Sequence, residues 1–291
     1  MQADEFSIRI KYLVISLATV AALIFYASTF TEPVLRVSFL PDESPSFMRR
    51  KFKPLTDYLE KEIEMKIEFR PMSNGDALVE ALVSNKLDMV WIDGANFIQA
   101  KARSSDQVIP LVQREEDAKT QSVFITAHHD ITKLEDLKGR TISFASKTSA
   151  SGHLMPRYYL LEAHIDPDTG MKRIFSGSAD ATVAAVASGE DDAGALSSAS
   201  WEKLIEQGKV DTKVVQVFYT TPGYHDYNWA VSANMDANLR LHLTDAFLKL
   251  DRNNGPDKEI LNLQRATKFI PARAEDYSII EAAARSPGSS P

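Results

Sequence analysis

Thr141-Ile-Ser-Phe-Ala-Ser-Lys-Thr-Ser-Ala-Ser-Gly-His-Leu-Met-Pro-Arg-Tyr-Tyr-Leu160 changes its hydrophobic pattern partway along. Its first residues alternate, with Ile142 and Phe144 apolar, and this alternation predicts a short strand. Beyond the loop, Leu154 and Leu161 stand at helical spacing and predict a helix. Small hydroxyl residues and a glycine join the two elements. The chain is therefore expected to contain strand–loop–helix units, which are typical of α/β folds.

The loop inside this stretch predicts an anion site. A strand that passes through Ser, Thr and Gly into a helix leaves several backbone N–H groups unpaired at the positive end of the helix dipole. The candidate ligand-binding residues are Ser149, Ala150, Ser151, Gly152 and His153. The alternative is that Ser149 or Ser151 caps the helix and binds nothing. The residues alone leave both interpretations open.

The loop carries enough donors for useful affinity. A hydrogen bond to a charged group contributes about 1.5–3 kcal/mol, and micromolar binding corresponds to about 8 kcal/mol. The N–H groups of Ala150, Ser151 and Gly152, with the hydroxyls of Ser149 and Ser151, reach four or five such bonds. We therefore expect that no arginine is required.

The composition narrows the classes of partner. The chain has 291 residues, of which 44% are hydrophobic and 25% charged, and its formal net charge is -7. A dispersed acidic balance argues against nucleic acid, which requires a basic face. An anion would have to bind through local dipoles, against an unfavourable overall field. There is no cysteine, so disulfides and Cys-ligated zinc are excluded.

The amino terminus resembles an export signal. Arg9 and Lys11 precede the apolar run 12–27, which gives the basic and apolar regions of a secretory signal. No clean cleavage site follows, and the run is near the ~17-residue lower limit for a membrane-spanning helix. Residues 1–31 are thus a signal peptide or an uncleaved membrane anchor. Both alternatives place the rest of the protein in the periplasm or on the outer face of the cytoplasmic membrane.

Strands and helices alternate along the chain and predict parallel α/β sheets. The expected strands are 34–40, 65–70, 87–92, 108–112, 121–126, 173–175, 193–196, 214–219 and 227–231, besides the one before the anion loop. The expected helices include 47–63, 76–85, 97–102, 131–137, 181–188, 200–207 and 239–250. Loops that follow strands gather at one edge of an open sheet and form its binding cleft. Here they are 41–45, 93–97, 146–153, 176–180, 197–200 and 220–227.

Several segments together resemble a known family. The chain is similar to the periplasmic substrate-binding proteins of ABC importers for phosphate, phosphite, phosphonate and related oxyanions, in particular the branch often labelled selenate-binding. The resemblance covers about 34–273. It is carried by 52–59, 80–91, 134–139, 149–157, 175–181 and 192–196.

The resemblance implies a two-lobe periplasmic-binding-protein fold, type II-like, with two crossover strands at a hinge. We expect one lobe from 32–120 plus 227–284, the other from 121–226, and a disordered tail at 285–291. The lobes would hold a small tetrahedral oxyanion of the phosphonate, phosphite, phosphate or selenate/sulfate type. The protein would deliver it to an ABC permease and its ATPase, as a monomer.

The sequence departs from the family pattern at four positions. The family's Ser-Thr-Ser-Gly loop has Ala150 as its middle residue here, and Phe97 replaces a frequent Tyr. The family His of the Gly-Ser-His-Asp loop is Ala179. Where phosphonate binders tend to place an Asp for the ligand's amino group, this chain has Ala199. These departures argue against an aminophosphonate.

Further candidate ligand contacts are Ser178, Phe97 and Tyr227, with Asp93, Asn96 and Asp226 as a second tier. A fully deprotonated dianion such as sulfate needs only donors. A protonated phosphate or phosphite also offers a hydrogen and is better met by a carboxylate. Asp93 and Asp226 lie on cleft loops and could be that acceptor, although Asp is also common in turns.

Other functions have weaker support. Ser149 near His153 suggests a nucleophile and base, but the chain has no Gly-x-Ser-x-Gly elbow, so we expect no enzyme. His128 and His129, adjacent on a predicted strand, would point to opposite faces and not bind one metal. No metal or cofactor is expected. The remaining alternative is a membrane-anchored oxyanion sensor or accessory protein with the same cleft.

Overall fold

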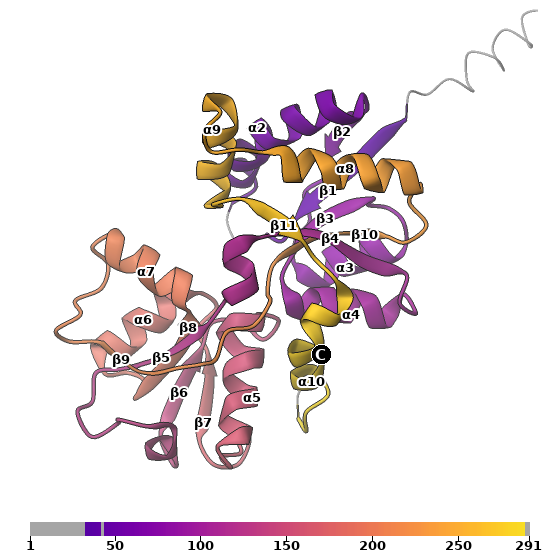
Figure 1. Cartoon of the computed structure of the whole chain (residues 1–291). Coiled ribbons are helices and arrows are strands. Elements are labelled where there is room, and N and C mark those ends of the chain that lie inside the picture. Colours follow the sequence, from indigo (N-terminus) through magenta and orange to yellow (C-terminus); the bar gives the residue numbers. More distant parts are fainter. Residues whose placement is uncertain (1–32, 42–43, 289–291) are drawn as a thin grey trace, which may run out of the picture. The chain divides into compact units, whose positions relative to one another are not determined.

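Two β-sheets organise the computed structural model, which describes residues 33–41 and 44–288. The first sheet has six strands in the order β11-β4-β10-β3-β1-β2, and the second has five in the order β7-β6-β8-β5-β9. From Leu35 onward the described residues form one compact unit. Figure 1 shows helices packed around each sheet.

The six-stranded sheet combines the first third of the chain with its last part. Its strands are β1 (Val34–Phe39), β2 (Lys66–Phe69), β3 (Met89–Ile92), β4 (Val108–Arg114), β10 (Asn228–Ser232) and β11 (Phe269–Pro271). The helices around it are α2 (Pro45–Ile63), α3 (Gly75–Val83), α4 (Gly94–Arg103), α8 (Ala237–Lys249), α9 (Gly255–Gln264) and α10 (Ser278–Ala284).

The five-stranded sheet is formed by the middle of the chain. Its strands are β5 (Ser122–Thr126), β6 (Thr141–Phe144), β7 (Lys172–Phe175), β8 (Ala193–Ser197) and β9 (Gln216–Thr220). Its helices are α5 (Met155–Glu162), α6 (Ala179–Ser188) and α7 (Ser198–Glu206). Short 3₁₀ helices occur at Glu115–Lys119, Leu134–Leu137 and Ala274–Tyr277, and a π-helical turn, Ala150–Leu154, precedes α5.

The sheets are mixed, so the expectation of purely parallel sheets is wrong. β1 and β3 are parallel, as are β6, β7 and β8. β10 runs antiparallel to β3 and β4, and β5 runs antiparallel to β8 and β9. β5 and β10 are the strands through which the chain enters each sheet from the other one. A strand that enters at the edge where its parallel neighbours end must run opposite to them.

Each sheet has a hydrophobic core on both faces. In β3, Met89 and Trp91 pack among α2, α8 and α9, whereas Val90 and Ile92 pack among α3, α4 and α10. This is the alternation that the strand period of two requires. Trp229 is fully buried in the first of these cores.

Two chain segments connect the sheets. The first runs from β4 through Glu115–Lys119 into β5, and the second runs from β9 through residues 221–227 into β10. They lie side by side and antiparallel, with Thr120 bridging to Tyr224. The N–H of Asp226 donates to the Asp117 carbonyl at 3.0 Å. The structure therefore has the two crossovers that the resemblance implied.

The structure differs from the sequence expectations elsewhere. β11, α10 and the 3₁₀ helix Ala274–Tyr277 were not predicted. His128 and His129 follow β5 in a turn and do not continue the strand. The described part of the predicted disordered tail is ordered, because buried Arg157 donates to the Ser286 hydroxyl at 3.3 Å and to the Pro287 carbonyl.

The predicted leader, 1–31, lies outside the described residues. Among those that are described, no helix combines the length and apolar character of a membrane span.

A matched pair of leucines tests the core beside α2. Leu55 is 0% exposed in α2, whereas Leu241 is 57% exposed in α8. We expect Leu55→Ala to lower the free energy of unfolding by about 2–5 kcal/mol, because it leaves a cavity. Leu241→Ala should change it by less than about 0.5 kcal/mol. Urea denaturation followed by circular dichroism measures both, and equal effects would contradict this account of the core.

Candidate functional site

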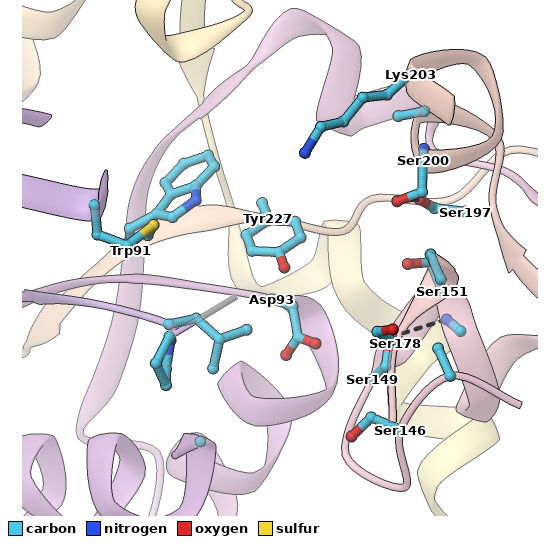
Figure 2. Close-up of a pocket in the computed structure, with 18 of the residues that line it drawn as sticks. Trp91, Asp93, Ser146, Ser149, Ser151, Ser178, Ser197, Ser200, Lys203 and Tyr227 are labelled. Carbon is cyan, nitrogen blue, oxygen red and sulfur yellow. Dashed lines mark hydrogen bonds between the residues drawn. The ribbon is translucent and has the colours of Figure 1, made fainter. Parts of the chain in front are cut away.

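A cavity of about 1000 Å³ lies between elements of the two sheets. One wall comes from the six-stranded sheet and its helices, including Trp91, Asp93 and Tyr227. The other comes from the loops after β6, β7 and β8, and Figure 2 shows their serines facing Trp91 and Tyr227 across the space. The predicted cleft loops therefore do meet at one place.

The lining includes the N-cap residues of five helical segments. They are Asn74 before α3, Asp93 before α4, Ser149 before the π-helical turn and α5, Ser178 before α6, and Ser197 before α7. All five segments begin shortly after a strand ends, at the edge where ligands of α/β sheets bind. The positive ends of five helix dipoles thus converge on the cavity.

Each cap side chain accepts one N–H from its own helix. The donors are the N–H groups of Ala77, Asn96, Gly152, Ala181 and Ser200, at 2.9, 2.9, 2.9, 3.2 and 3.1 Å. A serine that accepts in this way still carries its own hydroxyl hydrogen. The capping alternative for Ser149 is therefore correct in geometry, and it leaves this side chain able to donate to a ligand.

Cations also line the cavity, which corrects the expectation of a site built from dipoles alone. Its described lining contains Arg50, Lys51, Arg114, Lys203 and Arg265 against only Asp93 and Asp180. Local charge is therefore opposite in sign to the net charge of -7. The sequence did not reveal this, because these residues come from four separate segments that only the fold brings together.

Arg114 is held rigidly in the wall. Its guanidinium lies 5.0 Å from the ring of Trp91, and Trp91 stacks on Tyr227 with ring centroids 5.3 Å apart. Its Nε and Nη2 donate to the carboxylate of Asp117, each at 2.6 Å. Burial and the charge of Asp117 act in opposite directions on the pKa of Arg114, and the net effect is to raise it. Part of its positive charge is thus compensated within the protein.

Two backbone donors of the anion loop already have partners. The N–H of Ala150 donates to Oδ2 of Asp93 at 3.2 Å, and that of Gly152 donates to Oγ of Ser149 at 2.9 Å. Our expectation that three amides are free is therefore wrong for these two, because an internal carboxylate and the helix cap occupy them. Gly152 packs so closely that a Cβ there would lie 2.9 Å from Cβ of Ala145.

The structure brings together most of the predicted site residues. The candidates that line the cavity are Ser149, Ser151, Gly152, Ser178, Tyr227, Asp93 and Asn96. In Figure 2 the Ser151 hydroxyl and the Asp93 carboxylate point into the space between the two walls. Asn96 links Asp93 to the anion loop. Its side-chain nitrogen donates to Oδ1 of Asp93 at 2.7 Å and to the Thr148 carbonyl at 3.4 Å. Contact of these residues with a ligand stays a prediction.

Four candidates lie behind the lining instead. Phe97 is 0% exposed and packs on Tyr277, with ring centroids 4.8 Å apart. The side chain of Ala150, within the anion loop, is fully buried. His153 lies between Phe144 and Phe175 and contacts the Lys147 carbonyl through Nδ1 at 2.9 Å. Asp226 is buried in the second crossover. Ala150 and His153 face inward because the loop turns its hydroxyls toward the cavity, whereas Phe97 and Asp226 belong to α4 and to the second crossover.

Other lining residues were not among the named candidates. Ser146, Thr148, Ser197 and Ser200 lie in loops that were predicted to form the cleft, whereas sequence reasoning missed Asn74, Trp91, Arg114 and Lys203. Asn74 and Ser197 had a usable signal, because each stands immediately before a helical pattern, where caps are preferred. The aromatic and basic residues had none, since such side chains are common throughout the chain.

Asp93 and Asp226 form a buried pair at the amino end of α4. Oδ1 of Asp93 accepts from the N–H of Asn96, and Oδ1 of Asp226 accepts from the N–H of Gly94 at 3.0 Å. Burial raises the pKa of Asp93, although its hydrogen bonds act against this. Burial, followed by the charge of Asp93, raises the pKa of Asp226 well above its usual value. Burial therefore disfavours two negative charges in this pair.

Within 33–41 and 44–288, no cluster of three or more His, Asp or Glu side chains is arranged to hold a metal ion. The site therefore consists of helix termini, hydroxyls, cations and one buried carboxylate that reaches the lining. Such a set binds and orients an anion. The fold and this cavity define a two-lobe solute-binding protein of the periplasmic type.

The family follows from direct comparison. Residues 37–277 match the family described as ABC transporter, phosphonate, periplasmic substrate-binding protein. The chain belongs to this family, and it is thus a solute-binding component of an ABC importer. The comparison confirms the resemblance at family level.

Two relatives illustrate the relationship. A probable ABC transporter phosphite binding protein, PhnD1, from Prochlorococcus marinus (strain MIT 9301) is 31% identical over 286 residues, which cover 94% of this chain and 96% of that protein. The structure of PhnD1 in complex with methylphosphonate has a TM-score of 0.77 and 32% identity, covering 87% of this chain and 97% of that one. A phosphonate transporter binding protein from Pseudomonas aeruginosa shares the fold at 18% identity, with a TM-score of 0.72 and 87% and 85% coverage.

The burial of His153 gives a testable result. Burial lowers its pKa from 6.5 to about 4, so the unfolded chain takes up a proton between pH 6.5 and 4 that the folded protein does not. The stability contributed by the neutral ring is therefore present above pH 6.5 and is lost as pH falls toward 4. We expect the His153 ring signals in NMR spectra to titrate near pH 4, and His153→Asn to flatten the loss of stability below pH 6.5. His242→Asn, at an exposed position of α8, is the control. Titration of His153 near 6.5 would contradict its placement.

Proposed function

We propose that this protein captures a small tetrahedral phosphorus oxyanion, of the phosphonate, phosphite or phosphate type, and delivers it to an ABC permease. The observation that carries the proposal is the convergence of five helix N-caps on one cavity, three of them serines on the same wall. The relatives support the ligand class, because PhnD1 is named for phosphite binding and its structure contains methylphosphonate.

The hydroxyls and dipoles supply enough free energy for this role. The hydroxyls of Ser149, Ser151 and Ser178 each contribute about 1.5–3 kcal/mol when they donate to an anion. Together they approach the ~8 kcal/mol of micromolar binding, and helix termini and the cavity's cations add to this. The ordering of the lobes on closure costs part of the gain.

Asp93 favours a protonated oxyanion over sulfate or selenate. Its carboxylate reaches the lining of the cavity and is 3% exposed. A phosphorus oxyanion that retains a proton can donate it to this carboxylate, whereas sulfate and selenate at neutral pH have no proton to offer and meet a like charge. We therefore do not extend the proposal to the selenate-type ligands that the resemblance also allowed.

The ligand lacks an amino group in this proposal. Ala179 and Ala199 line the cavity at the positions where the family tends to place a His and an Asp. A methyl side chain cannot pair with an ammonium group, and an unpaired buried ammonium is costly. Phosphite, phosphate and simple alkylphosphonates therefore fit better than aminophosphonates.

The biological setting is proposed from the family. The protein is exported, acts as a monomer outside the cytoplasmic membrane, and contacts that membrane through residues 1–31 or through the permease. We propose lobes at 32–120 plus 227–284 and at 121–226, joined at the paired crossovers, with closure around the ligand. The relatives named above are carriers, so the alternative of an anchored sensor has no support from them.

A ligand panel tests the proposal. Phosphite, methylphosphonate and phosphate are expected to raise the melting temperature by about 5 °C or more at 100-fold excess over Kd, since such an excess stabilises by about 2.7 kcal/mol. Sulfate and selenate should give much smaller shifts. Ser151→Ala should raise the Kd of the best ligand, measured by calorimetry, by about 10- to 100-fold. Ser188→Ala, an exposed serine of α6, serves as the control. No shift with any phosphorus oxyanion would refute the function.

Asp93→Asn tests the origin of selectivity. The amide keeps an oxygen for the N–H of Asn96 but loses the negative charge. We expect binding of methylphosphonate or phosphite to weaken by about tenfold or more, and sulfate and selenate to bind more tightly than to the wild type. Calorimetric titration of all four ligands measures the change in preference. An unchanged ratio of sulfate to phosphite affinity would show that Asp93 does not sort the ligands.

A further inference from the structure

Asp226 connects the hinge to the ligand site. It lies in the second crossover, 1% exposed, and its N–H donates to the Asp117 carbonyl of the first crossover at 3.0 Å. Its carboxyl accepts from the N–H of Gly94, the residue after Asp93. Asp93 in turn accepts from the N–H of Ala150 in the anion loop. A short chain of contacts thus runs from the crossovers, across the start of α4, to the loop that faces the ligand.

The groups around Asp226 give the pair Asp93–Asp226 no dedicated ion-pair partner among the described residues. Asp93 faces it from α4, Asp117 and Arg114 from the first crossover, Tyr224 from its own segment, and Tyr277 from the 3₁₀ helix before α10. Arg114 is bonded to Asp117 through two nitrogens. Among the residues that the structure describes, neither Asp93 nor Asp226 has an ion-pair partner.

A proton on one of the two carboxyl groups removes the repulsion between Asp93 and Asp226. Two buried carboxylates at one helix terminus repel each other, and the loss of solvent favours the neutral form of one of them. Asp93 accepts three hydrogen bonds, from the Asn96 backbone and side chain and from Ala150, whereas Asp226 accepts one. The proton therefore belongs on Asp226, and Asp93 carries the charge.

We propose that Asp226 is a positioning residue for oxyanion binding, which must hold a proton so that Asp93 and the ligand share the site with one protein charge instead of two. The inference rests on the proposed function and adds a requirement that the cleft itself does not reveal. When Asp226 ionises, the pair carries two charges and repels the arriving anion. By linkage, a bound oxyanion also makes Asp226 hold its proton more tightly.

The requirement for a proton on Asp226 makes the affinity for the oxyanion fall as pH rises. Asp226 is protonated at the lower end of the pH range, so binding is strongest there and weakens as pH rises through the ionisation of Asp226. Loss of one required proton weakens binding by at most tenfold per pH unit. Asp226→Asn retains an oxygen for the N–H of Gly94 and cannot ionise, so it lacks this loss.

The experiment is calorimetric titration of the full-length protein with methylphosphonate from pH 6 to 10. The wild type, Asp226→Asn and the control Asp245→Asn, at an exposed position of α8, are compared. Ionisation of methylphosphonate affects all three alike, so the ratio of wild-type to variant Kd isolates Asp226. We expect this ratio to rise by up to tenfold per pH unit for Asp226→Asn and to stay constant for Asp245→Asn. A constant ratio for both would overturn the inference.

Two further outcomes are decisive. If circular dichroism shows that Asp226→Asn does not fold, the wild type is titrated in two buffers of different ionisation enthalpy, where binding must take up more protons than methylphosphonate itself accounts for. Equality would refute the role of Asp226. If the wild type binds neither methylphosphonate nor phosphite at any pH, the proposed function fails and this inference with it, whereas binding with pH-independent ratios removes the inference alone.

Discussion

The convergence of helix N-termini on one cavity is the constraint on which the rest of the structure depends. Each N-terminus carries roughly half a positive charge, so five of them provide the equivalent of two to three charges before screening. The five caps, Asn74, Asp93, Ser149, Ser178 and Ser197, stabilise these termini individually. A single helix end would attract an anion weakly. Five ends set around one space make that space electrostatically suited to a small anion.

This convergence explains the topology. Helices that all start at the cleft require strands that all end there, and this holds for the parallel strands of both sheets. The chain must nevertheless pass twice between the sheets. It does so through β5 and β10, which enter from the cleft edge and therefore run antiparallel to their neighbours. The mixed sheets are thus a consequence of placing one binding site between two α/β units.

The sequence predicted the elements that local pattern controls. Two patterns were sufficient to place most strands and helices: alternation, as at Ile142 and Phe144, and helical spacing, as in α2. The loop 146–153 was also recognised as part of the site. The three-residue strand β11 was missed because it is too short to show a period. The sequence predicted β5 and β10 as strands but not their antiparallel direction, because strand direction depends on the path of the chain in space. The buried positions of Phe97, His153 and Asp226 depend on side-chain orientation close to the ends of strands and helices, which spacing does not determine.

The charges in the cleft show why local and global electrostatics must be separated. A net charge of -7 suggested that an anion would bind against the field of the protein, yet most of the charged residues that line the cavity are cations. Screening limits distant surface carboxylates to about 10 Å at moderate salt, so nearby groups dominate. Among these, Arg114 is compensated by Asp117, whereas Asp93 has no such partner within the described residues. In our proposal, the cations attract any small anion, and the uncompensated carboxylate of Asp93 distinguishes an oxyanion that carries a proton from one that does not.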